Sequence, residues 1–263
     1  MKRRYTDKLA AFERLLRIMD DLREGCPWDK EQTWQSLRIL TIEEMYELVD
    51  AILEDDAEGI KEEIGDLMMH MVFYAVIGEE KRAFDLKDAL DGICDKLVER
   101  HPHIYGAANV SGAEEVRQNW EQIKLTTGKK SLLAGVPKSL PAIVKAYRLQ
   151  EKTATVGFEW EEVGQVWEKV EEEIAELKEE VAKVEKGEKN GSQERIESEF
   201  GDVLFALVNY GRFLGVDPEA ALEKVNNRFK ARFEYIEGHS AKPLSDMTLD
   251  EMTHLWEEAK TKV

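Results

Sequence analysis

Apolar residues recur along most of this chain at intervals of three and four positions. In the segment 6–23, TDKLAAFERLLRIMDDLR, they alternate with charged residues in the period of an amphipathic helix. No stretch shows the sustained period-two alternation that is typical of a strand. The sequence therefore predicts an all-α fold. The predicted helices lie at residues 6–23, 41–54, 62–78, 86–100, 113–124, 166–186, 193–215, 217–237 and 248–260.

Two of these helices begin with residues that favour a helix start. Asp217 followed by Pro218 is an N-cap acid with proline in the first turn. Thr41 and Glu44 have the spacing of a capping box. One interpretation of Glu44 is therefore that it caps the start of this helix. The stretch KVEKGEKNGS at 183–192 predicts an exposed loop between two helices.

The two halves of the sequence resemble one another. EIGDLMMHMV at 63–72 matches EFGDVLFALV at 199–208 with an offset of 136, and other blocks match in the same order at offsets of 129 to 136. Any two amphipathic helices look alike, but that does not explain the repeated Trp and Gly positions. We predict tandem duplicated helical-bundle domains at residues 1–128 and 141–263, joined by a linker at 129–140.

The charge of the chain limits its partners. With 37 basic and 55 acidic residues, the net charge is −18, which disfavours a nucleic acid polymer or an anionic membrane. The two cysteines, Cys26 and Cys94, form neither a disulfide framework nor a zinc motif. The N-terminus has no apolar segment of signal-peptide length. We therefore expect a cytoplasmic protein with reduced thiols.

Acidic residues follow the same pattern in both halves, E-E-x-x-E and later E-x-x-D. Residues three apart share a helix face, so two packed helices would bring four or five carboxylates together. Two charges about 4 Å apart cost roughly 4 kcal/mol at an effective dielectric constant near 20, so such a cluster needs protons or a cation. The acids of the second half are Glu172, Glu173, Glu176, Glu199 and Asp202.

Oxygen ligands in this number suit Mg²⁺ or Mn²⁺. The predicted ligands in the second half are Glu173, Glu176, Glu199 and Asp202. A second metal site in the first half would use Glu44, Glu47, Glu63 and Asp66.

Structural interpretations compete with this one. Glu199 and Asp202 run into a strongly apolar helix, where a salt bridge would also satisfy their charges. Gly65 and Gly201, each before the Asp, indicate close helix approach or core packing. The neighbouring acids Glu171, Glu179 and Glu180 predict a solvated face.

Two other protein classes also gather acidic helices. A di-metal carboxylate bundle of the ferritin type needs E-x-x-H twice, and this chain has it once, from Glu251 to His254. A non-catalytic acidic helical scaffold remains an alternative. The P-loop signature is missing from the sequence, which excludes that class of nucleotide hydrolase.

The acidic motifs, together with GCPWDKEQTW, RHPHIYG, NWEQIK and VGFEW, resemble the MazG-type all-α nucleoside triphosphate pyrophosphohydrolases over nearly the whole chain. The resemblance implies Mg²⁺-dependent hydrolysis of NTPs or dNTPs to NMP and pyrophosphate, by attack of water at phosphorus. It also implies a homodimer. One of Glu172, Glu173, Glu176 or Glu199 would take the proton of the water.

Basic and amide side chains hold the substrate phosphates in that family. Leu40, Gly92 and Cys94 stand in the first half where the second half has Lys169, Lys224 and Asn226. We therefore predict that the C-terminal half is the better catalyst and that the N-terminal half is structural, weakly active or regulatory. The candidate substrate-binding residues are Lys169, Lys224, Asn226, Arg228, Arg232, Trp256 and Lys260. Simple core packing is the alternative interpretation of Trp256.

Overall fold

The computed structural model describes residues 5–108, 110, 112, 116, 131–188 and 191–262, and these residues contain helices and no strand. The predicted all-α class is confirmed. The chain divides into two compact units, Met1–Ala113 and Glu114–Val263. The predicted helix at 113–124 falls outside the described residues, apart from position 116, and so do residues 129 and 130 of the predicted linker.

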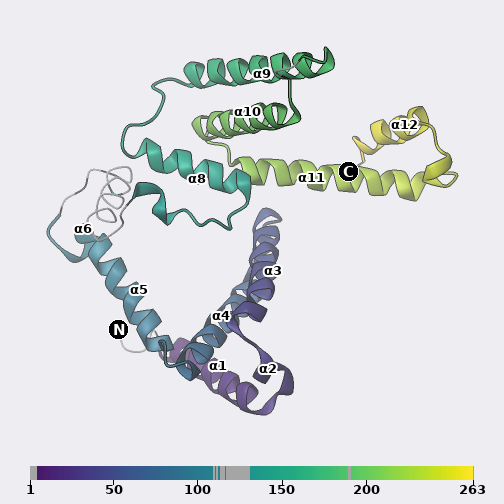
Figure 1. Ribbon diagram of the computed structural model, residues 1–263. Coiled ribbons are helices and arrows are strands. Elements are labelled where there is room, and N and C mark those ends of the chain that lie inside the picture. The colour runs from purple at the N-terminus through teal and green to yellow at the C-terminus, as the bar shows by residue number, and fades with distance from the viewer. Residues whose placement is uncertain are drawn as a thin grey trace. The chain divides into compact units, whose positions relative to one another are not determined.

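The first unit is built around two packed helices, α3 and α4 (Figure 1). The helix α1 packs on α4, and α5 follows α4 along the chain. The bounds are α1 Thr6–Gly25, α2 Pro27–Glu31, α3 Trp34–Leu53, α4 Ala57–Glu80, α5 Leu86–Arg100 and α6 Pro102–Tyr105.

A small apolar core fixes these helices against one another. Its buried members come from three helices and are Met19, Leu37, Val72, Phe73 and Ile77. Burial of such side chains contributes about 1.5–3 kcal/mol each, before the entropy cost of ordering the chain. The core therefore holds α3 along α4 and determines which of their side chains meet.

The start of α3 differs from the prediction. Thr33, not Thr41, caps the helix, in a capping box with Ser36. Thr41 lies inside the helix, where its hydroxyl donates to the Leu37 carbonyl (3.0 Å) and contacts the Tyr74 hydroxyl (2.7 Å). Glu44 is therefore not a capping acid, and its carboxylate is left for another role.

The second unit repeats this plan. Here α9 packs along α10, α8 packs on α10, and α12 folds back on α11 (Figure 1). Asp217 caps α11 as predicted, accepting from the backbone N–H groups of Glu219 and Ala220. The bounds are η2 Leu132–Gly135, α8 Ala142–Ala154, α9 Val163–Glu185, α10 Gln193–Phe213, α11 Pro218–His239, η3 Leu244–Asp246 and α12 Leu249–Ala259.

Helix α8 was not among the predicted elements, although it positions part of the site described below. Val166 and Val170 of α9 are buried with Val203 and Ala206 of α10, and these small side chains allow the pair to pack. A search of the described helices finds none whose length and apolar character would let it cross a bilayer.

Candidate functional site

Three carboxylates of the second unit meet between α9 and α10. Glu173 lies on α9, and Glu199 and Asp202 lie one turn apart on α10. One oxygen from each carboxylate lies within 4.8 Å of the other two. Glu173 is 8% exposed, so its charge is shielded from solvent. This group, the second-unit trio, comes from both acidic motifs that the sequence analysis selected.

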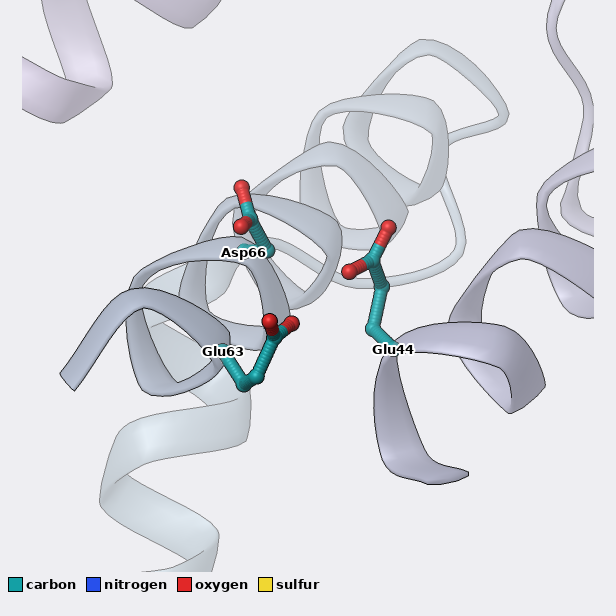
Figure 2. A group of neighbouring side chains, drawn as sticks. All are labelled: Glu44, Glu63 and Asp66. Carbon is teal, nitrogen blue, oxygen red and sulfur yellow. The ribbon is translucent and has the colours of Figure 1, made fainter. Parts of the chain in front are cut away.

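The first unit contains the equivalent group. Glu44 of α3 faces Glu63 and Asp66 of α4, and Figure 2 shows the three side chains directed toward one another. Here too, one oxygen from each carboxylate lies within 4.8 Å of the other two. The repeat offsets of 129 and 136 make this first-unit trio the counterpart of the second-unit trio, position for position.

The fourth predicted ligand of each site lies at the edge. Glu176 and Glu47 are exposed and stand outside the two trios. The charge of Glu176 is nevertheless close enough to contribute to the raised pKa of Glu199. Similarly, Glu47 contributes to the raised pKa of Glu63.

The acids of both trios perturb one another. Burial raises the pKa of Glu199 most, followed by the charges of Glu176 and Asp202. Burial also raises the pKa of Glu63 and of Glu44, which share a side-chain hydrogen bond. In addition, Glu63 Oε2 is buried without a hydrogen-bond partner. These oxygens fit a hard divalent cation, which would neutralise the cluster and fill the unmet acceptor.

Of the two units, only the second has a lysine one turn before its E-E-x-x-E motif. Lys169 Nζ lies 2.8 Å from Glu172 Oε1 and 2.7 Å from Glu173 Oε1, and these acids raise the lysine's pKa. At the equivalent position of the first unit, Leu40 packs against the apolar core. The two trios therefore share their acids but differ in their cations.

A cavity of about 580 Å³ opens beside the second-unit trio. Lys169, Glu173 and Asp202 form part of its wall. The remainder comes from η2, from α8, from the connection between α8 and α9, and from the α10 face that follows Asp202. Its further lining residues are Leu133, Leu149, Gln150, Thr153, Gly157, Phe158, Glu159, Trp160, Phe205, Ala206, Asn209 and Arg212.

Most of these lining residues were missed by the sequence analysis. The block VGFEW, at 156–160, carried the available signal, because a motif on a loop points to function more than to packing. Within the wall, Arg212 donates to Asn209 Oδ1 (3.1 Å from Nη2) and forms an ion pair with Glu159. This pair fixes the connection against α10.

The predicted substrate-binding residues of α11 and α12 lie apart from this cavity. Lys224, Asn226 and Arg228 are exposed on α11, and Asn226 donates to Glu223 (3.0 Å). The Arg232 guanidinium lies 5.6 Å from the ring centroid of Trp256. Lys260 pairs with Glu257 (2.6 Å). None of these six predicted residues is in the cavity wall, so of the predicted basic residues only Lys169 joins the acids there.

Two structural expectations about neighbouring residues are wrong. Glu180 is 8% exposed rather than solvated, and Lys183 pairs with it (2.8 Å), whereas Glu171 and Glu179 are exposed as expected. Gly65 and Gly201 are also exposed. A Cβ at either glycine would meet nothing within 4 Å. Neither close helix approach nor core packing within the unit explains them.

Comparison with known proteins agrees with this duplicated arrangement. The model of the MazG nucleotide pyrophosphohydrolase domain matches twice, at residues 32–105 and 160–236. Each match contains one complete trio.

Full-length relatives show the same similarity. A nucleoside triphosphate pyrophosphohydrolase of Escherichia coli is 40% identical, over 95% of this chain and 97% of that protein. The nucleoside triphosphate pyrophosphohydrolase/pyrophosphatase MazG of Thermotoga maritima is 41% identical, over 95% of each chain. YabN of Bacillus subtilis is 45% identical over 95% of this chain, which spans 51% of YabN. The chain belongs to the MazG nucleotide pyrophosphohydrolase family and carries its domain twice.

Proposed function

We propose that this protein is a nucleoside triphosphate pyrophosphohydrolase that converts NTPs or dNTPs to NMP and pyrophosphate in its C-terminal half. The observation that carries the proposal is the meeting of three carboxylates, two of which line one cavity together with Lys169. Its volume of about 580 Å³ lies in the range of small-molecule sites. The names of the relatives and the family support the same activity.

The cation in this proposal is Mg²⁺, which Mn²⁺ can replace. Glu173, Glu199 and Asp202 would hold it, with Glu176 at the edge of the site. When bound, it supplies positive charge to phosphate oxygens and acidity to water. The net charge of −18 makes such a neutralising charge important for an anionic substrate.

The chain's own side chains supply the remaining chemistry. Lys169 keeps its proton because Glu172 and Glu173 raise its pKa, so it can donate to the phosphate oxygens throughout the reaction. Glu172 and Glu176 flank the trio with exposed carboxylates. One of these two accepts the proton of the attacking water.

The first unit is proposed to be structural or weakly active. It has the trio, but Leu40 stands where the second unit has Lys169. Cys26 and Val76 occupy the positions of Phe158 and Arg212, at offsets of 132 and 136. The first unit therefore retains cation ligands without the lysine or these cavity residues.

Two further features extend the proposal. Apolar side chains three and four positions apart are exposed on α10 and α11, which is typical of an interface and supports a homodimer. The exposed apolar residues of this surface are Phe200, Leu204, Leu207, Leu222, Val225 and Phe229.

The mass of the protein in solution tests the dimer. Sedimentation equilibrium should give twice the 30.3 kDa chain mass, whereas a single-chain mass would contradict the dimer.

The cysteines bear on the location of the protein. Both cysteines are free, which supports a cytoplasmic location.

The products of the reaction test the activity directly. Purified protein with Mg²⁺ and a panel of NTPs and dNTPs should yield NMP and pyrophosphate, resolved by ion-exchange chromatography. Release of NDP and phosphate would contradict the proposal. Absence of both turnover and metal uptake would favour the acidic scaffold instead.

Paired substitutions test which trio supports catalysis. Glu199→Gln with Asp202→Asn should lower kcat/KM by at least about 10³-fold, because two charged ligands are replaced by neutral isosteres. Glu63→Gln with Asp66→Asn is the matched control in the first unit and should leave most of the activity. The reverse result would assign catalysis to the N-terminal half.

A single substitution tests the electrostatic description. The raised pKa of Glu199 means that the folded state holds its proton more tightly than the unfolded state, so stability is lost as pH rises through that pKa. With a chelator present, Glu199→Gln should therefore raise Tm at neutral pH, and the gain should shrink below about pH 4. Glu197→Gln, exposed on the same helix, is the control. A lower Tm for Glu199→Gln would indicate an ion-paired carboxylate instead.

A further inference from the structure

The second unit has another cavity, which shares no lining residue with the one beside the trio. It opens between the end of α11 and the first turns of α12, where α12 folds back on α11 (Figure 1), and its volume is about 600 Å³. Its wall includes two of the five histidines of the chain, His239 and His254, and two acids, Asp250 and Glu251. The proposed hydrolysis uses none of these four side chains. We call this space the α11–α12 cavity.

Both histidines present the same ring nitrogen for binding. His239 Nδ1 lies 2.8 Å from the Tyr235 carbonyl oxygen, and His254 Nδ1 lies 3.3 Å from Glu258 Oε1. Because carbonyl and carboxylate oxygens accept hydrogen bonds, Nδ1 carries the proton in both rings, and Nε2 of each neutral ring keeps its lone pair. Histidines that bind metals typically donate from one nitrogen to such an oxygen and bind the metal with the other. Both rings therefore already have the tautomer that a metal at Nε2 requires.

The side chains around the cavity can converge on one ion. The ring of His239 is held by stacking on Tyr235, with ring centroids 3.8 Å apart. Asp250 lies one turn before His254 on α12, so their side chains share a helix face. The His254 side chain is 76% exposed, so its ring has room to rotate toward a cation that His239 and Asp250 also contact.

Of the two acids in the wall, Asp250 is the better ligand. Glu251 Oε2 accepts from the Thr248 backbone N–H (2.7 Å), Oε1 accepts from Lys242 (2.9 Å), and these bonds lower the pKa of Glu251 to about 2. Glu251 is therefore held in the capping box of α12 and adds only negative charge. The E-x-x-H spacing in the sequence thus contributes its histidine, His254, while the neighbouring exposed Asp250 supplies the carboxylate.

We propose that the α11–α12 cavity binds one divalent cation of the Zn²⁺ class through Nε2 of His239, Nε2 of His254 and the carboxylate of Asp250. Imidazole nitrogens suit such ions, whereas Mg²⁺ prefers the oxygen ligands of the two trios. The bound cation joins the end of α11 to α12. This inference is independent of the proposed pyrophosphohydrolase function, because none of its ligands takes part in that reaction.

Isothermal titration calorimetry with Zn²⁺ in excess Mg²⁺ tests the site. The starting chain carries Glu63→Gln, Asp66→Asn, Glu199→Gln and Asp202→Asn, so that neither trio contributes. Adding His239→Gln or His254→Gln should in each case remove one bound Zn²⁺ per chain, because each change deletes one of only three protein ligands. Adding Asp250→Asn should weaken the binding of that Zn²⁺ by at least about tenfold.

Matched controls use the same kinds of substitution elsewhere. His101→Gln with His103→Gln alters the other neighbouring pair of histidines, whose ring centroids lie 5.6 Å apart, and Asp246→Asn alters an exposed acid outside the cavity wall. Both should leave the binding of this Zn²⁺ unchanged. Loss of Zn²⁺ with His101→Gln and His103→Gln, and none with His239→Gln, would overturn the proposal.

Nuclear magnetic resonance tests which nitrogens bind. In long-range ¹H–¹⁵N spectra, Zn²⁺ should shift the Nε2 resonances of His239 and His254 together, at one equivalent, while both Nδ1 atoms stay protonated. A shift in only one of the two rings, or binding through Nδ1, would overturn the shared site. An unchanged number of bound Zn²⁺ ions in either single histidine variant would overturn it as well.

Discussion

The mutual repulsion of the clustered carboxylates is the constraint on which the rest of the site depends. Packing of α9 along α10 brings one carboxylate oxygen each of Glu173, Glu199 and Asp202 within 4.8 Å of one another. Burial and neighbouring charges raise the pKa of Glu199 as a result. Burial of Val166 and Val170 of α9 with Val203 and Ala206 of α10 stabilises this arrangement, and a bound cation would relieve the repulsion.

The duplication shows which parts of the arrangement can vary. Both units keep the trio at equivalent positions on an equivalent helix pair, so the helix packing alone reproduces it. The surroundings have diverged: Lys169 and Phe158 in the second unit are replaced by Leu40 and Cys26 in the first. A repeated acid cluster is therefore compatible with one unit that cleaves and another that is structural or weakly active.

The sequence predicted that acids of two helices would meet because their helical spacing and their repetition are both local patterns, although three carboxylates gather in each unit rather than four or five. Glu44, Glu63 and Asp66, and their counterparts, meet as the shared helix faces indicated. The cavity could not be predicted in the same way. It combines α8 with the connection before α9, and the contact between Gln150 and Phe205 joins residues 55 positions apart.

The burial of Glu180 was missed for a related reason. Its neighbours Glu171 and Glu179 are exposed, so the composition of the segment gives no sign that one acid faces inward. The substrate contacts predicted for residues of α11 and α12 stay a prediction. Lys224 and Arg228 share the predicted stripe on α11, but within the described unit that stripe does not line the cavity.

Binding of Mn²⁺, followed by electron paramagnetic resonance, tests most directly whether the second-unit trio is a cation site. In a chain that already carries Glu63→Gln and Asp66→Asn, the account predicts that Mn²⁺ still binds. Adding Glu199→Gln and Asp202→Asn should then abolish that binding while the helical circular dichroism is retained. Unchanged Mn²⁺ binding after all four substitutions would contradict the account.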